Sequence, residues 1–267
     1  MVEIYQNRHY MKHVIMYSGG ICSWATAERL SKTVDRRDIL LLFTDTQCED
    51  GDLYRFLYES AAHFDIELKI IADGRTIWEV FKAVKFMGNS RIDPCSRILK
   101  RELADKWVAE HYKPDECIVY LGIDWSESHR IDRLKPRKLP YIYEAPMCEP
   151  PYLTKANMLD MCRESGVEPP RLYAMGFMHN NCGGFCIRSG QAQFRKLYIE
   201  KPDYYIECEN AEQEVFEVIG KEQPFLRVTE DGELHYLSLR TFRKRYLESD
   251  SKQIDLFDWG GCGCFFG

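Results

Sequence analysis

The segment that decides the fold predicted for this chain is His13-Val14-Ile15-Met16-Tyr17-Ser18-Gly19-Gly20-Ile21-Cys22-Ser23. Its first six residues read as a short buried strand, and after two glycines the apolar and small residues of 22–33 recur at helical spacing. A strand that turns through glycines into a helix presents free backbone N–H groups and the positive end of the helix dipole, which favour an anion. The hydroxyls of Ser18 and Ser23 add donors. Because tight turns also use two glycines without any ligand, this segment alone leaves a phosphate loop and a plain turn open.

The alternation of strand and helix continues through the first half of the chain. Apolar runs predict further strands at 39–43, 68–72 and 117–123, and helical periodicity predicts helices at 53–64, 77–87 and 97–112. Strands that alternate with helices in this way form parallel sheets with helices on both faces. We therefore expect an α/β protein with a Rossmann-like parallel sheet.

The chain changes character near residue 140, where prolines become frequent. Further on, a hairpin with an Asp231-Gly232 turn is predicted within 225–237, and a basic helix at 239–248. We thus expect an α/β domain at 1–140 that carries the glycine loop. A Cys-rich C-terminal region at 141–267 holds the hairpin and the basic helix.

Composition and charge narrow the class of protein. The 267 residues are 45% apolar and carry 36 basic and 42 acidic side chains, a formal net charge of −6. The chain can therefore bury a substantial core, and its overall charge does not steer it toward nucleic acid. No apolar run typical of a signal peptide is found, nor one of the roughly 18 residues that a membrane span needs. We expect a cytoplasmic protein, in which the eleven cysteines do not form a disulfide framework and the clustered ones are metal ligands or catalytic thiols.

Polar side chains follow two further strands, at the edge where open α/β sheets bind their ligands. Thr44-Asp45-Thr46 closes the second predicted strand. The segment 122–130 follows the fourth and offers Asp124, Glu127 and Arg130. Each set alone fits loop solvation or helix capping. Three sets at one edge, the glycine loop included, predict a ligand site.

These segments resemble a known family. Ser18-Gly19-Gly20-Ile21-Cys22-Ser23 is similar to the SGGxxS PP-loop signature of the ATP pyrophosphatase superfamily. Other segments follow the order of its phosphoadenylyl-sulfate (PAPS) reductase-like branch, as in the ATP pyrophosphatase component of DNA phosphorothioation systems. They are Phe43-Thr44-Asp45-Thr46, Cys95-Ser96-Arg97-Ile98-Leu99-Lys100 and Gly122-Ile123-Asp124-Trp125-Ser126-Glu127-Ser128-His129-Arg130. The resemblance covers roughly residues 13–190. It implies an adenine nucleotide alpha hydrolase-like fold, with the domain at 1–140 binding the nucleotide.

The resemblance implies one of two reactions. Pyrophosphatase members use ATP and Mg²⁺, release pyrophosphate, and adenylate an oxygen that nitrogen or sulfur then displaces. Reductase members bind an adenylylated sulfate and attack its sulfur with a cysteine thiolate. The reductases carry that cysteine in a C-terminal Glu-Cys-Gly-His type motif, which this chain lacks. Their iron–sulfur subgroup has adjacent cysteines where this chain has Cys95-Ser96.

The pattern therefore favours an ATP pyrophosphatase that adenylates an acceptor for sulfur insertion. Thiol-dependent reduction of PAPS or APS is the second interpretation, and a catalytically silent nucleotide-binding subunit of a larger complex is the third. For the leading interpretation the resemblance implies nucleic-acid thiolation or DNA phosphorothioation, a sulfur donor such as a cysteine desulfurase, and other subunits of a modification complex. The basic segments 130–138 and 240–245 are candidate nucleic-acid contacts, although solvated helix faces are the commoner reason for such segments.

The resemblance also implies which side chains act. The nucleotide-binding set is Ser18, Gly19, Gly20, Ile21, Cys22, Ser23, Thr44, Gly122 and Glu127. The catalytic set is Cys95, Asp45, Lys100 and Arg130, of which the two cations would partner the transferring groups. Cys95 lies at a predicted helix start beside Arg97 and Lys100, a setting that favours the thiolate and suits a persulfide carrier. An ordinary helix-start cysteine is the alternative.

Two close pairs of cysteines are candidate metal ligands: Cys182, Cys186, Cys262 and Cys264. Glycines flank both pairs, so the backbone can wrap a small ion, and four thiolates can hold Zn²⁺ or a [4Fe-4S] cluster. Free thiols are the alternative. Ligation would hold the C-terminal tail against the segment 176–190. Beside the first pair, His179-Asn180-Asn181 is interpreted as a turn rather than as ligands.

Overall fold

A five-stranded parallel sheet organises residues 12–144. The computed structural model describes residues 11–89, 91–249 and 253–261. The sheet has the order β3-β2-β1-β4-β5, and every neighbouring pair is parallel. Its strands are β1 (Lys12–Met16), β2 (Ile39–Asp45), β3 (Glu67–Ala72), β4 (Cys117–Leu121) and β5 (Ile142–Glu144). The predicted Rossmann-like α/β class is confirmed, and β5 is a strand that the periodicity did not predict.

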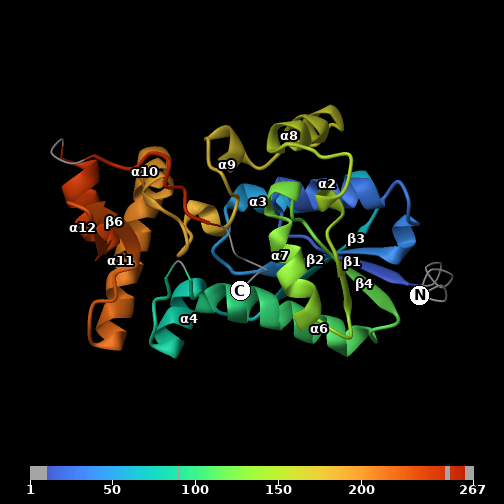
Figure 1. The fold of residues 1–267 in the computed structure, drawn as a ribbon, viewed down its shortest axis with the longest axis horizontal. Coiled ribbons are helices and arrows are strands. Elements are labelled where there is room, and N and C mark those ends of the chain that lie inside the picture. The colour runs from blue at the N-terminus through green and yellow to red at the C-terminus, as the bar shows by residue number, and fades with distance from the viewer. Residues whose placement is uncertain (1–10, 90, 250–252, 262–267) are drawn as a thin grey trace.

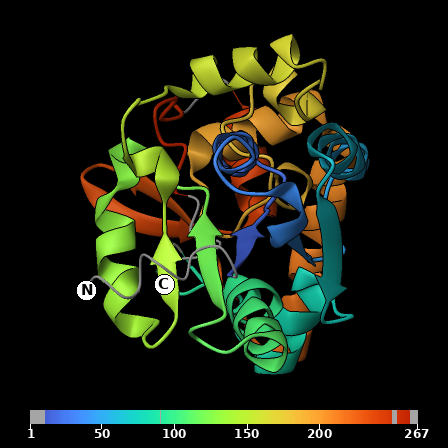
Figure 2. The ribbon, with the colours of Figure 1, turned by 90° about the vertical axis from the view of Figure 1, so that its right-hand side faces the viewer.

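Helices cover both faces of this sheet, because successive side chains of a strand point to opposite sides. Ile15, Leu41 and Phe43 pack against α2 (Ile21–Leu30), α3 (Gly51–Phe64) and α8 (Lys155–Glu164). Val14 and Leu42 pack on the other side, against α6 (Leu103–His111) and α7 (His129–Leu134). Figure 2 shows α2 above the sheet and α6 below it. The central strands β1, β2 and β4 are therefore buried on both faces, as the middle of a covered parallel sheet requires.

The part of the chain from α10 onward forms a second, mainly helical layer, on the left in Figure 1, whereas α9 (Arg171–Ala174) lies near α3. The elements of this layer are α10 (Gln191–Glu200), α11 (Pro202–Ile219), β6 (Leu226–Glu230), β7 (Glu233–Leu237) and α12 (Leu239–Phe242). The hairpin lies where it was predicted, and a π-helical turn over Arg243–Leu247 completes the predicted basic helix. Helices α10 and α11 were not predicted.

Short helical segments complete the described chain. They are α4 (Ile77–Val84), α5 (Pro94–Ser96), a π-helical turn at Arg97–Glu102, and 3-10 turns at Arg36–Asp38, Trp125–Glu127, Lys135–Arg137, Pro146–Cys148 and Cys182–Gly184. In the part of the chain that the structure describes, no helix is long and apolar enough to cross a bilayer.

One apolar core joins the C-terminal layer to earlier parts of the chain. Phe81 of α4 and Leu99 belong to the same cluster as Phe194 and Phe216 from α10 and α11. The sheet also extends beyond residue 140, because β5 lies at 142–144. The division into domains at 1–140 and 141–267 stays a prediction.

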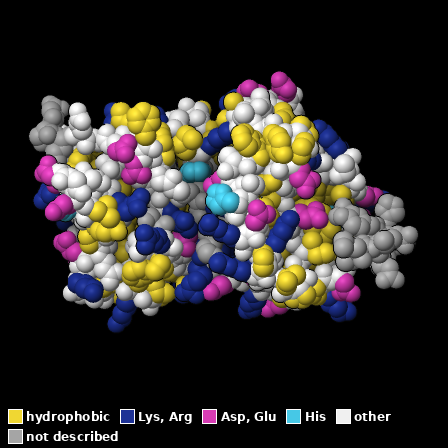
Figure 3. All heavy atoms as spheres, in the orientation of Figure 1, with side chains coloured by type: hydrophobic (Ala, Val, Ile, Leu, Met, Phe, Trp, Pro, Cys, Tyr) yellow, Lys and Arg dark blue, Asp and Glu magenta, His cyan; other side chains and the backbone are white. Residues whose placement is uncertain are grey.

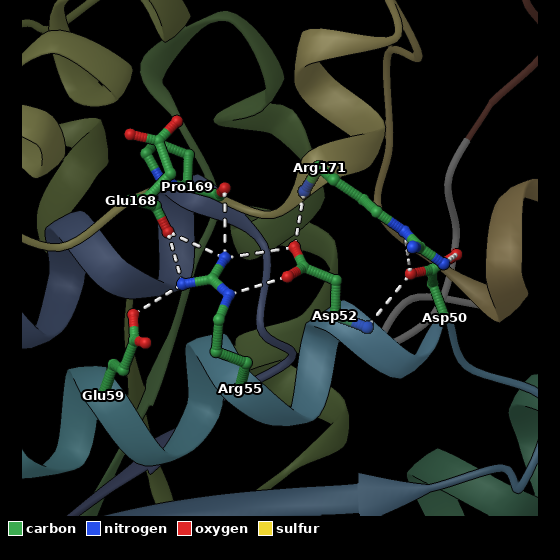
Figure 4. A network of polar contacts seen from close by, with 7 residues as sticks. All are labelled: Asp50, Asp52, Arg55, Glu59, Glu168, Pro169 and Arg171. Atoms are coloured by element: carbon green, nitrogen blue, oxygen red, sulfur yellow. Dashed lines mark hydrogen bonds and ion pairs between the residues drawn. The ribbon is translucent and has the colours of Figure 1, made fainter.

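Polar contacts fix the segment before α9 on α3. Arg55 donates to Asp52 Oδ1 at 2.6 Å and to the carbonyl oxygens of Glu168 and Pro169 at 3.1 and 3.4 Å. Arg171 pairs with Asp50, the N-cap residue of α3, at 2.7 Å. Figure 4 shows both arginines turned toward these partners. The start of α9, which carries Tyr173, is thereby held beside the sheet.

Candidate active site

The glycine loop connects β1 to α2, and its backbone is tightly fixed. Gly19 has φ +71°, a left-handed conformation, and a Cβ added there would lie 2.1 Å from Leu53 Cδ1 of α3. Ser23 Oγ donates to Gly20 O at 2.8 Å, and Asn180 Nδ2 donates to Gly19 O at 3.3 Å. Glycine is thus required at position 19 for both its conformation and its space.

The first backbone N–H group of α2 already has a partner. Ile21 N donates to the hydroxyl oxygen of Tyr173 at 3.1 Å, and Tyr173 comes from α9. The ammonium of Lys155 lies 4.7 Å from the centre of the Tyr173 ring, over its face. An anion bound at the start of α2 would therefore compete with the tyrosine hydroxyl and would lie near a cation.

The end of β4 approaches the loop closely. A Cβ on Gly122 would lie 2.6 Å from the backbone nitrogen of Ser23. Beyond it, Asp124 accepts a hydrogen bond from Ser126 N at 2.9 Å and caps a 3-10 turn. Arg130 donates to Glu127 Oε1 at 2.5 Å. The loop and the segment after β4, which the sequence predicted to share a sheet edge, therefore lie side by side.

These elements enclose a cavity of about 460 Å³. Eight of the predicted site residues line it: Ser18, Gly20, Ile21, Cys22, Ser23, Gly122, Glu127 and Arg130. Residues that the sequence analysis did not place in the site line it too: Trp125, Lys155, Tyr173, His179, Asn180 and Asn181. The segment interpreted as a turn, 179–181, is therefore part of the wall.

Two cations and a neutral imidazole face this cavity. The side chain of Arg130 is only 14% exposed, and Lys155 lines the cavity from the start of α8. Burial, and then the charges of Lys155 and Arg130, lower the pKa of His179 to about 4. The imidazole is consequently neutral near pH 7 and is a weak base there.

The other five predicted nucleotide-binding and catalytic residues are not in the lining of this cavity, and one of them is Gly19 of the loop itself. Asp45 Oδ1 accepts hydrogen bonds from Tyr54 at 2.9 Å and from Gln47 N at 2.7 Å. Lys100 is buried and pairs with Glu49 Oε1 at 3.4 Å. Thr44 is buried within β2, and Cys95 is buried in the C-terminal core. The sheet edge thus divides into the cavity and a separate buried polar cluster.

That buried polar cluster centres on the carboxylate of Glu49. Its oxygen atoms accept from Thr46 Oγ1 at 3.0 Å and from the backbone nitrogen of Cys182 at 2.5 Å, in addition to the ion pair with Lys100. Cys182 itself has φ +47°, a strained conformation for a residue with a side chain. The cluster therefore fixes the start of the 182–186 cysteine segment.

The thiols of the described residues are not grouped as a metal site. Among residues 11–89, 91–249 and 253–261, no group of three or more His, Cys, Asp or Glu side chains is placed to hold a metal ion. Cys262 and Cys264 lie outside these residues, so the predicted set of four ligands stays a prediction. Burial, with the charge of Asp124 next, raises the pKa of the Cys22 thiol in the loop. That thiol is protonated at neutral pH and is no nucleophile.

The described part of the tail packs beside the site. Ser189 and Gly260 form an antiparallel bridge, and Gly261 N donates to Arg188 O at 3.1 Å. Asp258 accepts from Gln191 N at 3.2 Å through its carboxylate. Gly260 and Gly261 also line the cavity. The tail thus reaches 188–191 through hydrogen bonds, close to the segment 176–190 that the cysteine hypothesis named.

The sequence matches no known protein-family profile and no curated protein. Solved structures are similar at low identity.

A phosphoadenylyl-sulfate (PAPS) reductase from Candida auris, in complex with phosphate, is 18% identical, with 66% of this chain and 84% of that chain covered and a TM-score of 0.44. The U34-tRNA thiolase NcsA from Methanococcus maripaludis, with its [4Fe-4S] cluster, is 15% identical, with 79% and 71% covered and a TM-score of 0.45. The NH3-dependent NAD synthetase from Campylobacter jejuni, in complex with the nitrate ion, is 16% identical, with 84% and 93% covered and a TM-score of 0.44.

Proposed function

We propose that this protein is a PP-loop ATP pyrophosphatase that adenylates an acceptor for sulfur insertion, in nucleic-acid thiolation or DNA phosphorothioation. The observation that supports the proposal best is the cavity of about 460 Å³ between the loop 18–23, the end of β4 and the start of α8. Its walls combine a helix start and glycines that admit close approach with the side chains of Arg130 and Lys155. Such a wall suits the phosphates of a nucleotide.

The reaction has two steps. An oxygen of the acceptor attacks the α-phosphorus of ATP, the bond to the bridging oxygen of the β-phosphate breaks, and pyrophosphate leaves. A sulfur nucleophile then attacks the adenylated centre, and AMP leaves. His179, whose low pKa keeps its imidazole neutral, would hydrogen-bond to the acceptor or the nucleotide and orient it, without taking up a proton. Arg130 and Lys155 would stabilise charge that develops on the phosphate oxygens.

The proposed function would use Mg²⁺, and it would also use a [4Fe-4S] cluster or Zn²⁺ if the four cysteines are ligands. Mg²⁺ is usually held by one or two carboxylates together with the nucleotide's phosphates, and Asp124 and Glu127 are carboxylates in the cavity wall that would take this role. A [4Fe-4S] cluster or Zn²⁺ would need Cys182 and Cys186 together with Cys262 and Cys264. Cys262 follows directly on Gly261, which lines the cavity.

Cys95 remains the proposed persulfide carrier, and Asp45 and Lys100 remain proposed catalytic residues. The surroundings of Cys95 hold cations that already have partners, since Arg101 pairs with Asp93 at 2.9 Å and Arg97 with Glu102 at 2.7 Å. A Cys95→Ser variant should keep ATP cleavage and lose sulfur transfer if the thiol carries the sulfur. Loss of both activities would assign Cys95 to the core instead.

Pyrophosphate release from ATP and Mg²⁺ tests the proposed function. Ser18→Ala and Arg130→Ala should lower kcat/KM by roughly 10- to 1,000-fold, as expected when phosphate-binding groups are removed. Lys106→Ala is the matched control, because this cation is highly exposed on α6. No turnover and no ATP binding in the intact chain would overturn the proposal. Release of sulfite from PAPS with a thiol, without ATP cleavage, would favour the reductase interpretation.

A further inference from the structure

Two large aromatic side chains stand exposed beside the cavity. Trp125, which lines it, is 45% exposed, and Tyr152 is 59% exposed. Their ring centroids lie 6.0 Å apart, with an angle of 53° between the planes. Large aromatic rings favour burial, and Trp24, Phe43 and Phe56 are buried here. The exposure of this pair is therefore a feature that the core does not explain.

Polar contacts hold the Trp125 side chain and the backbone that precedes Tyr152. The indole Nε1–H of Trp125 donates to Leu153 O at 3.1 Å. Arg29 of α2 donates to the carbonyl oxygens of Pro146, Glu149 and Pro151 at 2.5, 2.9 and 2.7 Å, and so fixes the segment that leads to Tyr152. An aromatic surface that is already rigid loses little entropy when a ligand stacks on it.

A basic segment follows the tryptophan directly. Residues 129–138 contain five basic side chains, Arg130, Arg133, Lys135, Arg137 and Lys138, and one acidic side chain, Asp132. Arg133, Lys135 and Arg137 are exposed. Helix α7 spans roughly 9 Å, so these charges begin within a short distance of the aromatic pair. Figure 3 shows Lys and Arg side chains gathered around the middle of the face on which α7 lies in Figure 1.

We propose that Trp125 and Tyr152 form a stacking site for an unpaired base of single-stranded nucleic acid, whose phosphates lie along 133–137. Aromatic faces joined to a row of cations suit a single strand, because its bases expose their π-faces and its backbone is anionic. A duplex hides those faces between its base pairs. This proposal deepens the proposed function, because it would place the acceptor beside the nucleotide. Adenylation of the bound strand rests on the proposed function, whereas binding of the strand does not, because binding needs no turnover.

Fluorescence anisotropy of labelled single-stranded DNA and RNA of about 12 nucleotides tests this site. The full chain should bind at least one of them more tightly than the matching duplex. Trp125→Ala and Tyr152→Ala should each weaken this binding by roughly 5- to 100-fold, and Trp125→Phe should restore most of it. Lys135→Ala should weaken binding of every sequence equally and reduce its salt dependence. Tyr236→Ala is the control, since this tyrosine is 46% exposed on β7.

Three results would overturn the site. They are no binding of the single strand by the intact chain, equal binding by Trp125→Ala, and equal or tighter binding of the duplex. A higher KM for ATP in Trp125→Ala with unchanged oligonucleotide binding would also overturn it, because the ring would then serve the adenine of the nucleotide. Pyrophosphate release is measured on the same preparations with and without oligonucleotide, because the proposed reaction needs an acceptor oxygen. Its absence, with stacking intact, would remove the proposed function and leave the stacking site.

Discussion

Gly122 joins the end of β4 to the start of α2 through contact with backbone atoms. A Cβ there would lie 2.6 Å from Ser23 N and 2.7 Å from Ser23 Cα, and a backbone cannot turn aside as a side chain can. We expect Gly122→Ala to lower the free energy of unfolding by about 1–3 kcal/mol and to weaken nucleotide binding. Chemical denaturation and nucleotide titration measure the two effects.

Gly51 gives the matched control for this substitution. It begins α3, its φ is not in the left-handed region, and a Cβ added there meets nothing within 4 Å. Gly51→Ala should therefore leave stability within about 1 kcal/mol of the parent or raise it. Equal losses in both variants would show that the close approach of β4 and α2 is not what makes Gly122 necessary.

Of the residues that line the cavity, the sequence predicted those that lie close together in the chain. Ser18, Gly20 and Ser23 were identified because glycines and hydroxyls recur within six residues after a strand. Tyr173 and Lys155 were not, because they enter the site from α9 and α8, and nothing in their local pattern indicates that α8 and α9 fold over the loop. A long-range contact of this kind has no periodic signal.

At the scale of elements, Glu212 links α11 to the start of α12. The carboxylate is fully buried, and its Oε2 accepts a hydrogen bond from Leu239 N at 2.8 Å. Burial raises the pKa of Glu212 from 4.5 to about 8, despite that hydrogen bond. Glu209 and Glu222 add negative charge nearby, and Glu209 is itself paired with Arg243 at 2.7 Å.

The raised pKa predicts a pH-dependent loss of stability. The folded state keeps a proton that the unfolded state releases between pH 4.5 and about 8, so the contribution is full below pH 4.5 and is lost as the pH rises through 8. Glu212→Gln keeps the acceptor oxygen and cannot ionise. Relative to the parent, its free energy of unfolding should rise by about 1–3 kcal/mol from about pH 5 to about pH 9. A difference independent of pH, measured by urea denaturation, would contradict this assignment.

Helix α10 receives its N-terminal cap from the tail. Its own N-cap residue, Gly190, has no side chain, and Asp258 supplies the oxygen that accepts from Gln191 N. Asp258→Ala should cost about 1 kcal/mol of stability and make the tail easier to cleave by protease. Asp255→Ala is the control, because Asp255 bonds to Phe257 N within the tail itself. Unchanged protease resistance in Asp258→Ala would mean that the cap does not hold the tail.

Strands and turns were predicted best where a strong signal lies within a few neighbouring residues. The strands at 39–43 and 68–72 and the hairpin at 225–237 were found because apolar runs and an Asp-Gly turn are local signals. Strand β5 has only three residues between prolines 140 and 146, too few for a pattern. Helix α11 buries Glu209 and Glu212, so its inner face does not read as apolar.

At the scale of the whole molecule, the shared core predicts cooperative unfolding. Phe81 and Leu99, from before residue 140, pack with Phe194 and Phe216 from after it. Neither region can bury these side chains alone. Calorimetry should therefore show one thermal transition whose midpoint rises when a bound nucleotide is present. Two resolved transitions would support the predicted division into independent domains instead.

The overall class of fold was predictable because the strand–helix alternation is regular, and the site only in part. Sequence order located the carboxyl edge of the sheet, where the loop and Arg130 indeed meet. It could not show that Glu49 would pair with Lys100 and draw that lysine away from the cavity. Which partner Lys100 takes depends on how the side chains are buried in the fold, and the order of residues in the sequence does not give that burial.

Because Ile21 N already donates to the Tyr173 hydroxyl, an anion can bind this N–H group only by replacing that hydrogen bond. Any ion that takes this N–H must first displace a partner that is already in place. A small ion such as free phosphate makes few other contacts to offset that loss, whereas a larger ligand gains contacts along the whole cavity. In the proposed nucleotide site, the Tyr173 hydroxyl would therefore favour a nucleotide over free phosphate.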